Sequence, residues 1–108
     1  MAKKEDKREI LKIAVNYIRL LKEHDVKVKK AYLYGSYVRG NFYSDSDIDV
    51  AVILDMDKGD MFEEHLRLMK LRRKIDTKIE PHVFSLKDFE KKIPFIKEIL
   101  REGIEIKV

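Results

Sequence analysis

The segment Ile48–Leu54, with the sequence Ile-Asp-Val-Ala-Val-Ile-Leu, limits the possible folds more than any other part of the chain. A nearly continuous apolar run of this length is typical of a β-strand that is buried inside a sheet. Asp47 precedes this run and Asp49 lies within it. Because side chains alternate across a strand, both carboxylates are expected on one face, about 6.6–7 Å apart. Two ionised carboxylates so placed destabilise each other unless a cation compensates them.

Magnesium is the cation that this pattern favours. Mg²⁺ prefers hard oxygen ligands and is usually held by one or two carboxylates together with substrate phosphates and water. A simpler alternative is that Asp45, Ser46 and Asp47 are turn or capping residues. An EF-hand calcium loop that starts at Asp45 is excluded, because its sixth and twelfth positions, which require Gly and Glu, hold Val50 and Met56.

The remaining elements follow from hydrophobic periodicity and from turn residues. Ser85 is suited to cap a helical turn, Pro94 fits the first turn of a helix, and Gly103 fits its end. The order α-β-β-α-β-α-β indicates an α/β or α+β fold, with a small mixed β-sheet packed against helices. We expect a helix over 7–23, strands over 28–34 and 48–54, a turn over 55–60, a helix over about 62–73, a strand over about 77–84, a helical turn over 86–90, a helix over 94–101 and a strand within 104–108.

Length and composition indicate a single folded domain over residues 1–108, with 44% hydrophobic and 41% charged residues. The absence of cysteine excludes disulfides and thiolate zinc sites. The sequence has no signal-peptide pattern and no apolar run near the ~18 residues of a membrane span, so we expect a cytoplasmic protein without a membrane partner. The net charge is +4, but no aromatic residues that could stack on bases lie among the basic clusters. This argues against a nucleic-acid partner.

Gly35 and Ser36 form a second feature, about ten residues before the carboxylates. They end the first predicted strand and begin a turn or short helix that continues to Gly40. This geometry directs backbone N–H groups and a hydroxyl toward an anion. The Walker A string is absent, and taken alone the Gly-Ser pair would favour a plain turn.

Together the two features resemble a known signature. The string Gly35-Ser36-x-x-Arg39-Gly40, followed by Ser46-Asp47-Ile48-Asp49 before an apolar strand, resembles the polymerase β-like nucleotidyltransferase superfamily and its minimal nucleotidyltransferase branch. The order of the predicted elements matches that family over most of the chain.

The resemblance implies a Mg²⁺-dependent enzyme that transfers a nucleoside monophosphate, with AMP from ATP expected, to a hydroxyl acceptor. Two Mg²⁺ ions are expected when the nucleotide is bound. The implied catalytic and metal-binding carboxylates include Asp47 and Asp49. The implied nucleotide-binding residues are Gly35, Ser36, Arg39 and Ser46.

The family also uses a third carboxylate on the following strand, for which Glu80 and Asp76 are the two candidates. We choose Glu80 as the third catalytic and metal-binding residue, because Ile79 and Val83 place it inside the apolar strand. The family more often has Asp at this position. His82 could act as a base or ligand, or it could be structural. Arg39 could bind phosphate or form a surface ion pair.

The chain lacks the additional domain with which larger relatives bind their acceptors. The acceptor is therefore expected on a partner protein or across a homo-oligomer interface. Minimal nucleotidyltransferases are typically paired with a small helical HEPN protein in toxin–antitoxin systems, which implies adenylylation of that partner. The alternatives are a non-catalytic antitoxin that neutralises the partner by contact, and a transferase that acts on RNA ends.

Overall fold

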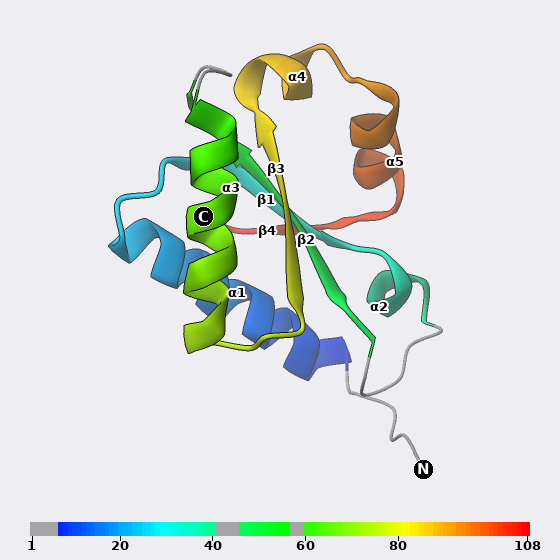
Figure 1. The fold of residues 1–108 in the computed structure, drawn as a ribbon. Coiled ribbons are helices and arrows are strands. Elements are labelled where there is room, and N and C mark those ends of the chain that lie inside the picture. Colours follow the sequence, from blue (N-terminus) through cyan, green and yellow to red (C-terminus); the bar gives the residue numbers. More distant parts are fainter. Residues whose placement is uncertain (1–6, 41–45, 57–59) are drawn as a thin grey trace.

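The computed structural model describes residues 7–40, 46–56 and 60–108, and these ranges contain ten helices and strands. Figure 1 shows their arrangement. In chain order they are α1 (Lys7–Glu23), β1 (Val28–Tyr34), α2 (Ser36–Arg39), β2 (Ile48–Leu54), α3 (Met61–Leu71), the 3-10 helix η2 (Arg72–Lys74), β3 (Ile79–Ser85), α4 (Leu86–Glu90), α5 (Pro94–Glu102) and β4 (Ile104–Ile106).

The four strands form one mixed sheet in the order β3-β2-β1-β4. Strand β1 runs antiparallel to both β2 and β4, whereas β2 and β3 are parallel. Strand β3 is an edge strand, which accommodates Pro81, a residue without a backbone N–H group. The Arg72 side chain donates a hydrogen bond to the Ile79 carbonyl at 2.8 Å on the same strand.

Helices cover both faces of the sheet, with α1 and α3 on one side and α4 and α5 on the other (Figure 1). Val50 and Val52 of β2 pack into the larger core under α1 and α3. Ala51 and Ile53 pack into the smaller core, which includes Ile96 of α5. Burial on both faces explains why β2 is nearly continuous in apolar residues.

Most predicted elements are confirmed by the structure, including the helix over 7–23 and the strands over 28–34 and 48–54. Ser85 caps α4 through a bond from the Asp88 N–H, and Pro94 begins α5. The helical turn predicted over 86–90 is confirmed as α4, and the turn or short helix predicted after Gly35 is the helix α2. No helix in the described part of the chain has the length and apolar character needed to cross a membrane.

The third strand begins later than predicted, at Ile79 rather than near Thr77. A turn delays it, in which the Asp76 carboxylate accepts a bond from the Lys78 N–H and the Asp76 carbonyl accepts one from the Ile79 N–H. Asp is favoured in such turns because its side chain can bond the backbone two residues later. Part of the predicted turn over 55–60 lies outside the described residues.

Tyr17 joins the two helices that lie under the sheet. Its ring is fully buried, and its hydroxyl donates a hydrogen bond of 2.8 Å to the Leu68 carbonyl of α3. Burial raises the pKa of Tyr17 well above its usual value, and nearby Arg72 opposes this only in part. The hydroxyl therefore remains a neutral donor at any physiological pH.

Replacement of Tyr17 by Phe should lower the free energy of unfolding by about 1 kcal/mol, because one buried hydrogen bond is lost. Urea unfolding measures the change as a shift in midpoint at constant slope. Tyr32→Phe is the matched control, since the Tyr32 hydroxyl has no hydrogen-bond partner among the described residues. It should change stability by less than about 0.5 kcal/mol. Equal losses in both variants would contradict the role given to the Tyr17 bond.

Candidate functional site

Two of the predicted carboxylates lie side by side in the sheet. The strand register pairs Asp49 of β2 with Glu80 of β3 on one side and with Tyr34 of β1 on the other. Paired residues on adjacent strands project to the same face, so Tyr34, Asp49 and Glu80 form one row. This row lies on the face covered by α5, and the Asp49 and Glu80 side chains are 26% and 39% exposed.

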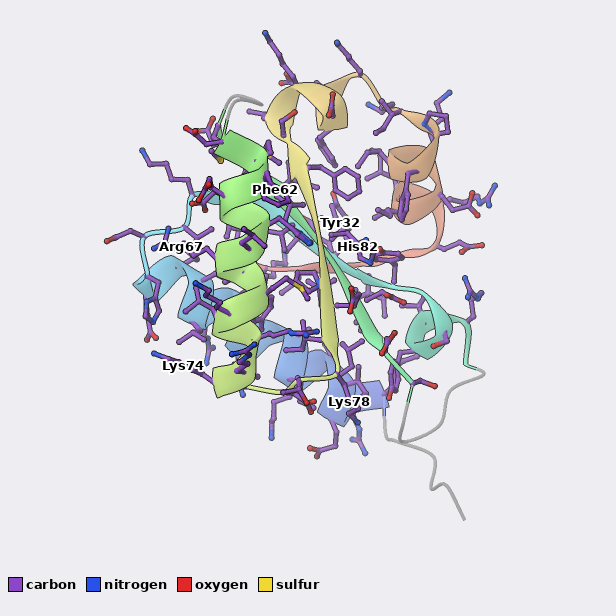
Figure 2. The ribbon with its side chains drawn as sticks, viewed as in Figure 1. Tyr32, Phe62, Arg67, Lys74, Lys78 and His82 are labelled. Atoms are coloured by element: carbon purple, nitrogen blue, oxygen red, sulfur yellow. The ribbon has the colours of Figure 1, made fainter. Side chains whose placement is uncertain are left out.

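Each carboxylate has a cationic or ionisable neighbour. Nη1 of Arg72 lies 3.6 Å from Oε2 of Glu80, and Nε2 of His82 lies 3.6 Å from Oδ1 of Asp49. Figure 2 shows His82 on the sheet face toward α5. The Arg72 charge, with that of His82 when it is protonated, reduces the repulsion within the acidic pair. From the sequence, the role of His82 was open. No role was predicted for Arg72, because its proximity to Glu80 depends on the η2 turn.

The Gly35 turn directly contacts the Asp49 carboxylate. Gly35 has φ +86° and ψ −151°, a backbone conformation that residues other than glycine rarely adopt. A Cβ atom at this position would collide with Oδ2 of Asp49 and would lie 3.1 Å from its Cγ. The absence of a side chain thus allows the turn that opens α2 to approach the carboxylate of β2. Val38 and Arg39 close this turn by donating backbone bonds of 3.1 Å to the Gly35 carbonyl.

A buried tyrosine fixes the entrance to β2. The Tyr37 ring is fully buried, and its hydroxyl donates a bond of 3.2 Å to the Ser46 carbonyl. Asp47 follows Ser46, is exposed and lies just before the start of β2. Tyr37 therefore positions the segment that carries Asp47. The sequence does not reveal this role, because nothing in it indicates which group the Tyr37 hydroxyl bonds. Asp45 lies outside the described residues.

A cavity of about 620 Å³ opens beside Asp49, between the sheet and α5. This volume is within the range of about 300–1,000 Å³ that is usual for small-molecule sites. The contribution of α5 to the cavity was not predicted from the sequence, because Phe95 falls beside the buried stripe formed by Ile96 and Ile99. The cavity is lined by Tyr34, Gly35, Arg39, Asp49, His82, Pro94, Phe95, Glu98 and Glu102.

Aromatic rings form one wall of this cavity. The Phe95 ring centroid lies 5.7 Å from that of Tyr34, 6.0 Å from that of His82 and 5.6 Å from that of Phe84. Burial raises the pKa of Tyr34 well above its usual value, and the negative charges of Asp49 and Glu80 raise it further. Tyr34 therefore adds no negative charge to the row.

Arg39 lies at the rim of the cavity and pairs with Glu102 of α5, with Nη1 and Oε2 separated by 3.9 Å. Its side chain is 56% exposed. Of the two roles considered for Arg39, the structure contains the surface ion pair. Because the guanidinium is accessible, it remains available to an anionic ligand.

The predicted acidic residues are only partly brought together. Asp49 and Glu80 are neighbours, whereas Asp76 lies in the turn before β3 and does not share a strand face with Glu80. No three His, Asp or Glu side chains within residues 7–40, 46–56 and 60–108 are grouped closely enough to hold a metal ion. Two hard carboxylates nevertheless fit Mg²⁺, which usually completes its shell with substrate phosphates and water.

Sequence comparisons relate the chain to known proteins. A family model described as polymerase beta nucleotidyltransferase matches residues 16–108. Two Methanocaldococcus jannaschii proteins, both named as candidate protein adenylyltransferases, are similar to the chain. One is 38% identical over 80 residues, which are 71% of this chain and 76% of that protein. The other is 31% identical over 96 residues, which are 89% of this chain and 92% of that protein.

Solved structures share the fold of this chain. The fold is similar to that of a candidate nucleotidyltransferase from Sulfolobus solfataricus, with a TM-score of 0.63 and 17% identity over 92% of this chain and 80% of the other. A toxin–antitoxin structure with AMP-PNP matches with a TM-score of 0.55 and 25% identity, over 84% of this chain and 70% of the matched chain. From the family match, the sequence relatives and this fold, we conclude that the chain belongs to the polymerase β-like nucleotidyltransferase family, in its minimal nucleotidyltransferase branch.

Proposed function

We propose that this nucleotidyltransferase transfers AMP from ATP to a hydroxyl group on a partner protein, in a Mg²⁺-dependent reaction within a toxin–antitoxin pair. One observation carries the proposal. The Gly35 turn, which is suited to bind phosphate, lies directly against Asp49, and Asp49 neighbours Glu80 in the sheet. A triphosphate held by this turn would therefore have its reacting end close to two carboxylates.

The roles of the chain follow from this placement. Gly35 and Ser36 would bind the triphosphate through the Ser36 hydroxyl and the backbone N–H groups of these two residues. Ser46 and Arg39, at the entrance of β2 and the cavity rim, would contact the nucleotide. The neighbouring Asp49 and Glu80 would hold Mg²⁺ together with Asp47, although the three carboxylates are not grouped closely enough for this in the described structure. When bound, Mg²⁺ stabilises the negative charge that develops during in-line displacement at phosphorus.

Glu80 would also help to remove the proton from the attacking hydroxyl. In the proposed reaction, the acceptor oxygen forms a bond to the α-phosphorus while the bond to the bridging oxygen of pyrophosphate breaks. A carboxylate within reach of the acceptor oxygen favours this step by general-base catalysis. Glu80 is partly exposed beside Asp49, which supports this role.

The acceptor is proposed to belong to a small helical protein of the HEPN type. The names of the two Methanocaldococcus jannaschii relatives and the toxin–antitoxin neighbour support a protein acceptor. The cavity beside Asp49 opens to solvent, so a side chain from another protein could reach this carboxylate. Tyrosine is the acceptor residue that the family resemblance favours.

A non-catalytic antitoxin that acts by contact is the second candidate. The Arg72–Glu80 and His82–Asp49 contacts favour it, because the acidic pair can be compensated without a metal ion. Calorimetry separates the two functions. Tight partner binding without ATP binding in the presence of Mg²⁺ would favour contact alone, whereas Mg²⁺-dependent ATP binding would favour the enzyme.

The main test mixes the chain with a small helical protein of the HEPN type, Mg²⁺ and α-labelled ATP. We expect label on the partner, and we expect Asp47→Asn and Asp49→Asn each to reduce its rate at least about 100-fold, since a charged metal ligand is lost. Omission of Mg²⁺ should have the same effect. Undiminished label in either variant would refute the role assigned to that carboxylate.

Glu80 and Asp76 can be distinguished in the same assay. Glu80→Gln should lower the rate of transfer about 100-fold or more, as expected for loss of a carboxylate that aids proton transfer. Asp76→Asn should leave the rate within about twofold, because its side chain can still accept the turn bond from Lys78. The reverse pattern would move the third catalytic carboxylate to Asp76.

Gly35 and Gly40 offer a matched pair of glycine replacements. Both have a positive φ, of 86° and 88°, but a Cβ at Gly40 would meet no atom of the described residues beyond its chain neighbours within 4 Å, whereas one at Gly35 collides with Asp49. Gly35→Ala should therefore displace the turn or the Asp49 carboxylate and lower the affinity for ATP at least about tenfold, a change that calorimetry resolves. Gly40→Ala should retain the affinity, with thermal unfolding as the check on folding. Equal ATP binding by both variants would contradict the proposed contact between turn and carboxylate.

A further inference from the structure

The outer face of α3, which we define as Phe62, Leu66 and Met69, leaves apolar side chains in contact with solvent. Phe62 is 72% exposed and Leu66 is 43% exposed. The three residues recur at i, i+4 and i+7, so they form one strip along the helix. Leu68 and Leu71 face the core from the opposite side of α3. The helix is therefore apolar on two sides, although only one side is covered within the described chain.

Exposed charges divide this face by sign along the helix. Glu63 lies near the N-terminal end of α3, whereas Lys70 lies near its C-terminal end, with Arg73 and Lys74 in η2. All four residues are exposed. Figure 2 shows Phe62 near the first end and Lys74 at the other. One end of the strip thus attracts the other end of an identical strip that runs in the opposite direction.

We propose that the outer face of α3 binds the same face of a second copy of the chain, with the two helices antiparallel. A two-fold axis near Leu66 would place Phe62 of each copy against the C-terminal half of the other helix. It would also place Glu63 opposite Lys70 of the second copy, twice by symmetry. An interface of this kind is isologous, the commonest arrangement in homodimers.

The charge pattern favours a second copy over a nucleic acid or an anionic membrane. Either of these would be attracted to Lys70, Arg73 and Lys74, but it would be repelled by Glu63, which lies beside the apolar strip. A second copy satisfies both ends with the same geometry. The contact is one helix pair and is smaller than the standard interface of about 1,600 Å², so the dimer forms at high protein concentration.

Sedimentation of the full chain over a range of concentrations tests the proposal. The unchanged protein should form a dimer with a dissociation constant below about 1 mM, as expected for a weak contact between two helices. Phe62→Ser combined with Leu66→Ser should raise the dissociation constant at least about tenfold. Leu100→Ser is the matched control, because Leu100 is a similarly exposed apolar residue on α5, and it should leave association unchanged.

Charge reversal tests the orientation of the helices. Glu63→Lys and Lys70→Glu should each weaken dimerisation about three- to tenfold, and the two together should restore it, because opposite charges again face each other. High salt should reduce these differences. A monomer at every concentration, a dimer insensitive to the Phe62 and Leu66 changes, or a double reversal that does not restore dimerisation would overturn the proposal. These outcomes do not depend on nucleotide transfer, so they leave the proposed function to its own tests.

Discussion

The close approach of Gly35 to the Asp49 carboxylate is the contact on which the arrangement of the site depends. It joins the turn after β1 to the start of β2, so the two halves of the sequence signature meet although Gly35 and Asp49 are separated by more than ten residues. Any larger residue at Gly35 would displace the carboxylate or the turn. The antiparallel pairing of β1 and β2 then fixes Asp49 opposite Tyr34, and the parallel pairing with β3 adds Glu80.

This row places two acidic groups side by side on a partly covered sheet face, and the fold compensates them locally. Arg72 reaches Glu80 from η2, and His82 reaches Asp49 from β3. The repulsion that an isolated acidic pair would suffer is thus reduced before any ligand binds. Both carboxylates remain partly exposed to solvent, and Asp49 also lines the cavity.

Sequence patterns predicted the elements well where periodicity was strong, as in α1, β1 and β2. The start of β3 was wrong because the side chain of Asp76 forms a turn that competes with strand pairing. The pairing of the Gly-Ser turn with the Asp-x-Asp strand was predictable from the motif. The contributions of Arg72, Tyr37 and Phe95 were not, since each depends on the path of a turn or on which side of a helix faces the sheet.

The edge of β3 limits how another protein can associate with this sheet. Pro81 has no backbone N–H to offer, and the Ile79 carbonyl is already bonded by Arg72. At the opposite edge, β4 is only three residues long. Few backbone groups at either edge are therefore available to pair with a strand from another chain. Such edge-to-edge pairing often leads to aggregation. Binding partners must instead recognise the protein through its side chains, which favours selective complexes over open-ended polymers.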